Sequence, residues 1–142
     1  MESLGDVFGS IGLISILYLA SRPVLQAVVE QYRQKGQTLP DMLKKIYQFV
    51  MKTHRYAGFV AVGAIVLHFF LQYREYGVVP VAGLIAGLLL MAQSVLGFGL
   101  TKQKDKERRK KMALLHRALG MLIVAAVLVH RVVGSLTDPQ PK

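Results

Sequence analysis

Cysteine is absent from the 142 residues of this chain. Its absence excludes disulfide bonds, iron–sulfur clusters, thiolate zinc sites and the Cys-x-x-Cys-His attachment of c-type haem. Acidic residues are few, with eight Asp and Glu against eighteen Lys and Arg. The N-terminal segment contains Glu2 and Asp6 but no basic residue, so we expect no cleavable signal peptide.

Long apolar blocks dominate what is present, and 53% of the residues are hydrophobic. The blocks cover about residues 7–29, 53–73, 78–100 and 113–134, and none contains Asp or Glu. A helix of about twenty residues crosses roughly 30 Å of hydrocarbon. The pattern predicts a single all-α integral membrane domain, residues 1–142, built as a four-helix bundle.

The first block is interrupted by Arg22 and Pro23. Either its helix continues with Arg22 near the lipid headgroups, or a separate interfacial helix begins at Pro23, because proline suits a first helical turn. The sequence leaves both alternatives open.

The basic residues, which give a net charge of +10, are concentrated in two connections, residues 31–52 and 101–112. The positive-inside rule places both loops in the cytoplasm and both termini outside. Short connections make the helices run up-down-up-down, which puts the second and fourth on a diagonal. Within 31–52, apolar residues at helical spacing predict a surface helix; they are Leu43, Ile46, Tyr47 and Val50. Basic loops between membrane spans favour contact with anionic lipid and argue against nucleic acid.

All four histidines lie in the second and fourth blocks: His54, His68, His116 and His130. The two in each block are fourteen residues apart. Fourteen helical residues return a side chain to within about 40° of its starting direction and advance it about 21 Å. Because the two helices run parallel, His54 is expected level with His116, and His68 level with His130.

One pattern, H-R-x-x-G-x9-H, occurs in both blocks. Its residues are His54, Arg55, Gly58 and His68 in the second block, and His116, Arg117, Gly120 and His130 in the fourth. Paired imidazoles at two levels can supply both axial ligands of two porphyrin irons. The glycines would let a porphyrin approach the backbone, and the arginines, together with Arg131, could pair with its propionates.

Other interpretations stay open for each residue type. A histidine in an apolar helix can be a hydrogen-bonded core residue, whereas a closed zinc site needs about four clustered ligands. The arginines could anchor helix ends at the headgroups, and the glycines, including Gly83 and Gly87, could serve helix packing. The polar pair Gln93 and Ser94 could touch a quinone or a neighbouring helix.

The paired His-x13-His helices resemble those of the transmembrane di-haem b-type cytochromes. That group includes the cytochrome b of respiratory complexes, the ascorbate-reducible cytochromes and the membrane domains of ferric reductases and NADPH oxidases. The resemblance covers about residues 52–134. It implies two haems b, with His54 and His116 on the inner iron and His68 and His130 on the outer iron.

The function implied is electron transfer across a membrane, between a quinol or a partner redox subunit and an acceptor on the other side. The chain would be such a cytochrome or the membrane subunit of an oxidoreductase, and a homo-oligomer is compatible with this. Without a flavin or nicotinamide domain it could not take electrons from NADPH alone. The compact size suggests a prokaryotic plasma membrane. The alternatives are a haem-binding anchor or assembly subunit and a cofactor-free membrane protein.

Overall fold

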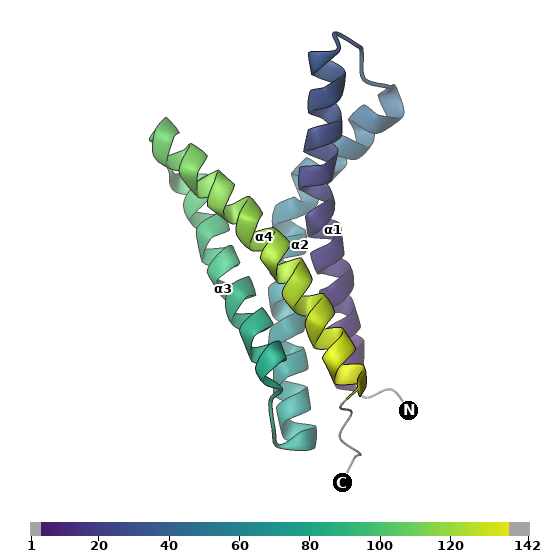
Figure 1. Cartoon of the computed structure of the whole chain (residues 1–142), viewed down its shortest axis with the longest axis vertical. Coiled ribbons are helices and arrows are strands. Elements are labelled where there is room, and N and C mark those ends of the chain that lie inside the picture. The colour runs from purple at the N-terminus through teal and green to yellow at the C-terminus, as the bar shows by residue number, and fades with distance from the viewer. Residues whose placement is uncertain (1–3, 137–142) are drawn as a thin grey trace.

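The computed structural model describes residues 4–136, which form four α-helices joined by short connections (Figure 1). The helices are α1 (Leu4–Gln34), α2 (Asp41–Tyr76), α3 (Val81–Lys102) and α4 (Lys106–Leu136). Each is long and apolar enough to cross a membrane. The prediction of an all-α chain with four helices long and apolar enough to span a membrane is therefore confirmed.

Helix α1 continues through Pro23, so no separate helix begins there. Proline removes one backbone hydrogen bond but leaves the rest of the helical ladder in place. Close packing against α2 supports the helix: a Cβ added at Gly12 would lie 2.6 Å from the Cδ1 atom of Ile65. The glycine therefore allows the two backbones to approach closely.

The connection predicted over residues 31–52 is much shorter in the structure. Gly36 ends the preceding helix with a positive φ of 64°, and α2 begins directly after Pro40. Residues 41–52 are helical and continuous with the second apolar block, because no glycine or proline separates them. The second basic connection, predicted over residues 101–112, is also shorter in the structure, because α4 begins at Lys106. The helices therefore carry their basic ends beyond the apolar blocks.

The helices pack as two antiparallel pairs, α1 with α2 and α3 with α4. Figure 1 shows the two pairs diverging toward the end that carries the α1–α2 and α3–α4 connections. Among the described residues, no Cα atom of α2 lies within 8 Å of a Cα atom of α4. The two histidine-bearing helices are therefore diagonal partners, with room for side chains between them.

The centre of the core is a layer to which each helix contributes one buried side chain. Its members are Ile16, Ala61, Leu90 and Ile123. Ala61 lies seven residues from each histidine of α2, and Ile123 lies seven from each histidine of α4. Seven helical residues correspond to about 10 Å along the axis. The apolar layer thus separates two histidine levels.

Candidate functional site

The structure brings the four histidines together as two facing pairs. The ring centres of His54 and His116 lie 6.5 Å apart, with the ring planes at 72°. The ring centres of His68 and His130 lie 6.4 Å apart, with the planes at 69°. All four side chains are half-buried. Each pair therefore consists of imidazoles that face one another across the diagonal of the bundle.

These separations can be tested against the geometry of an iron held between two imidazoles. A metal–nitrogen bond is about 2 Å, and an imidazole nitrogen lies about 1.1 Å from its ring centre, so opposed ligands have centres about 6.3 Å apart. The observed 6.5 and 6.4 Å lie close to this value. Both ring-centre separations are therefore those that an iron held between two imidazoles would require.

The Nδ1 atoms divide the histidines into two kinds. His68 Nδ1 donates a hydrogen bond of 2.7 Å to the backbone carbonyl of Gly5 in α1. This bond leaves the lone pair on Nε2, the nitrogen that a metal would then bind, and raises its basicity. The Nδ1 atoms of His54, His116 and His130 are buried and lack a hydrogen-bond partner within residues 4–136. Helix α1 therefore fixes the tautomer of His68.

Glycines on the adjacent helices lie against three of the rings. A Cβ added at Gly9 would lie 2.9 Å from Nδ1 of His68. One added at Gly83 would lie 2.9 Å from Cε1 of His130, and one at Gly97 would lie 3.1 Å from Cε1 of His116. Only glycine allows these rings to occupy their positions without a shift.

Sequence reasoning missed these ring-facing glycines and assigned Gly83 only to helix packing. The signal was present in α3, where Gly83 and Gly97 are fourteen residues apart, the same interval as His116 and His130. Because α3 and α4 are antiparallel, Gly83 lies at the level of His130 and Gly97 at the level of His116. The spacing of the glycines therefore mirrors the spacing of the histidines.

The two glycines of the repeated pattern have different surroundings. A Cβ at Gly58 would meet no atom within 4 Å, so space remains beside His54. At Gly120 the Cβ would lie 3.2 Å from Nε2 of Gln93, which donates a 2.9 Å hydrogen bond to the carbonyl of His116. Gln93 thus contacts the neighbouring helix, one of its two proposed roles. Open space at Gly58 suits close approach of a flat macrocycle.

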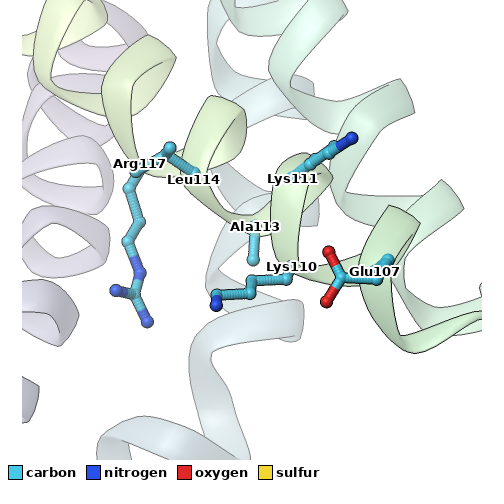
Figure 2. Close-up of a pocket in the computed structure, with 6 residues that line it drawn as sticks. All are labelled: Glu107, Lys110, Lys111, Ala113, Leu114 and Arg117. Atoms are coloured by element: carbon cyan, nitrogen blue, oxygen red, sulfur yellow. The ribbon is translucent and has the colours of Figure 1, made fainter.

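The three arginines beside the histidines also differ. Arg55 is exposed and its guanidinium lies 5.9 Å from the ring centre of Phe59, one turn along the same helix. Arg131 is exposed next to His130. Arg117 is exposed on α4, where Figure 2 shows it extending from the helix on the same side as Lys110. An open groove of about 440 Å³ follows this face; its lining residues are Glu107, Lys110, Lys111, Ala113, Leu114 and Arg117.

Groups of three or more His, Asp or Glu side chains able to hold a bare metal ion do not occur within residues 4–136. The histidines meet only in twos, an arrangement that matches porphyrin iron better than a closed zinc site. No family model, curated protein or solved structure matches this chain. Its function must therefore be inferred from the residues and their geometry.

Proposed function

We propose that this chain is a di-haem b-type cytochrome that carries electrons across a membrane. The observation that supports this most strongly is the ring-centre separation of the two histidine pairs, 6.5 and 6.4 Å, at two levels of one bundle. Two independent pairs with nearly the same separation are not expected from core histidines that hydrogen-bond at random. Such pairs are expected when the two histidines of each pair hold one iron between them.

The chain's own residues account for binding. His54 and His116 would hold the inner iron, and His68 and His130 the outer iron, with one imidazole on each side. A haem held by two histidines of the chain in this way would be suited to electron transfer rather than to binding a further ligand. When bound, haem supplies an iron that changes its charge by one electron at a potential set by its ligands and surroundings.

The two proposed haems would be separated by the stretch of the bundle that lies between the two histidine levels. Fourteen residues correspond to about 21 Å along a helix, a large part of the hydrocarbon thickness. The intervening layer of Ile16, Ala61, Leu90 and Ile123 is apolar and buried, so water is excluded between the levels. Two carriers at these depths would divide one long transfer into shorter ones.

The orientation we propose follows the charge distribution. The basic ends of α1, α2, α3 and α4 face the cytoplasm, and both termini face outside. The plasma membrane is the proposed location. Electrons would pass between a quinol or a redox partner subunit on one face and an acceptor on the other. An acidic partner would be steered to the basic face by charge.

Purified protein reconstituted into vesicles tests this function. Ferricyanide is trapped inside, a membrane-impermeant reductant is added outside, and the loss of ferricyanide absorbance is followed. We expect reduction across the bilayer with the wild-type chain and its loss with His68→Leu, which removes an outer ligand. A haem-binding anchor would contain haem without this transfer, whereas a cofactor-free protein would contain no haem. Either result would overturn the proposal.

A further inference from the structure

Arg22 lies within the bundle in the middle of α1, although a charged side chain in an apolar helix is costly unless it has a partner or a function. Its side chain is half-buried. The Nε–H group donates to the sulfur of Met51 in α2 over 3.2 Å. Met51 precedes His54 by three residues, about one turn, so the guanidinium is located just on the cytoplasmic side of the inner histidine pair.

A second contact fixes the register of α1 at this level. Tyr18, one turn before Arg22, shares a hydrogen bond with Thr53, the residue next to His54. The position of Arg22 beside the inner pair therefore follows from two interhelical contacts, at Thr53 and at Met51.

The charges around Arg22 are all of one sign or neutral. Its neighbours are His54 and His116, the phenol of Tyr47, and Arg117 of α4. No Asp or Glu forms an ion pair with Arg22 in the part of the chain that the structure describes; the nearest acidic residue along α1, Glu30, accepts a bond from Gln34 instead. A half-buried guanidinium without an acidic partner is stabilised by an anion.

We propose that Arg22 provides an anion site that binds a carboxylate of the inner porphyrin. This inference rests on the proposed function and extends it. It brings α1, which lies outside the resemblance to di-haem cytochromes, into the cofactor site. Guanidinium forks suit carboxylates because two parallel N–H groups meet two oxygens. Arg22 acts here as a binding residue and not as a headgroup anchor.

The arrangement also distinguishes the two levels. At the outer level, α1 carries Gly9 against His68, and the sequence has no Lys or Arg before Arg22. Arg131 lies next to His130, on α4 itself. Arg55, the third candidate at the inner level, is engaged with Phe59 on an exposed face. The inner level therefore has an arginine on α1 that the outer level lacks.

The test compares Arg22→Gln with Arg33→Gln, an exposed arginine near the cytoplasmic end of the same helix. Two readouts are used in detergent: a two-step redox titration and the rate at which haem leaves for an excess of apo-globin. Loss of a charge-assisted bond predicts about 10- to 100-fold faster release of one haem. It also predicts a lower midpoint potential for that haem, because a cation stabilises the reduced, less positive iron. Arg33→Gln should leave both readouts unchanged, and Arg22→Lys, which keeps the charge, should be intermediate.

A second arm uses haem dimethyl ester, in which both carboxylates are blocked. Apoprotein loaded with the ester should release it equally fast from the wild type and from Arg22→Gln. A difference that persists undiminished would mean that Arg22 acts through packing or through lipid phosphate, and would overturn the inference. Unchanged release and potential in Arg22→Gln with normal haem would also overturn it while leaving the di-haem assignment intact. Absence of haem from the wild type would instead refute both.

Discussion

A single methyl group added at Gly83 should weaken haem binding at the outer histidine pair and leave the inner pair unaffected. A Cβ there would lie 2.9 Å from Cε1 and 3.3 Å from Nδ1 of His130. Ordinary carbon contacts are about 3.5–4.0 Å, so the ring or the helix must move by about 0.6–1 Å. The observed ring-centre separation of 6.4 Å is close to that needed for ligation, so the pair has little room to absorb this shift.

The expected penalty can be worked from the cost of overpacking. Inserting a methyl group into a packed site costs about 1–3 kcal/mol. If the cost falls on the ligated state, haem affinity at the outer pair drops by about 5- to 150-fold. Gly83→Ala should therefore lose outer haem while keeping inner haem. Gly97→Ala should do the reverse, because its Cβ would lie 3.1 Å from Cε1 of His116.

The assay is haem per chain, from the pyridine haemochrome spectrum, together with the two steps of a redox titration. Gly87→Ala is the matched control, since it lies one turn from Gly83 on α3 and its Cβ would meet no atom within 4 Å. Both changes gain the same helix propensity, about 1 kcal/mol. Two intact haems with unchanged potentials in Gly83→Ala would refute the role of the glycine. Equal losses in Gly87→Ala would show that the helix, and not the ring contact, is responsible.

Three other outcomes are expected. His54→Leu should lower haem content from two per chain to one and remove the inner redox step; retention of both haems would contradict the pairing. Ala61→Leu should destabilise the bundle by about 1–3 kcal/mol, because Ala61 is 0% exposed in the central layer. A thermal midpoint unchanged from that of exposed Val60→Leu would contradict this. Since the chain has no cysteine, Gln37→Cys should react with an impermeant maleimide only from the cytoplasmic side and Val78→Cys only from outside. Opposite labelling would reverse the proposed orientation.

Much of the arrangement could be predicted because it depends on helical periodicity. The four apolar blocks are long enough to span, and fourteen residues return a side chain to the same face. The pairing of levels then needs only the alternating direction of the helices. Residues 41–52 extend α2 because their amphipathic pattern runs without a break into the next block, a continuity that the basic charges concealed.

The contribution of α1 could not be predicted in the same way. The Gly5 carbonyl on His68, the contact of Gly9 with that ring and the position of Arg22 beside Met51 all depend on the register between α1 and α2. That register is determined by close packing at Gly5, Gly9 and Gly12, whose spacing indicates a packing face but not the residues of α2 that it contacts. Every residue type, moreover, has a backbone carbonyl, so the sequence does not indicate which one His68 contacts.

Haem content and spin state of the purified wild-type protein test the central claim most directly. A reduced-minus-oxidised visible spectrum and an electron paramagnetic resonance spectrum of the oxidised form would be recorded on protein made with ample haem supply. We predict two haems b per chain, both low-spin with two imidazole ligands. No haem, a single haem, or high-spin iron with an open axial position would contradict the assignment of His54, His68, His116 and His130 as two ligand pairs.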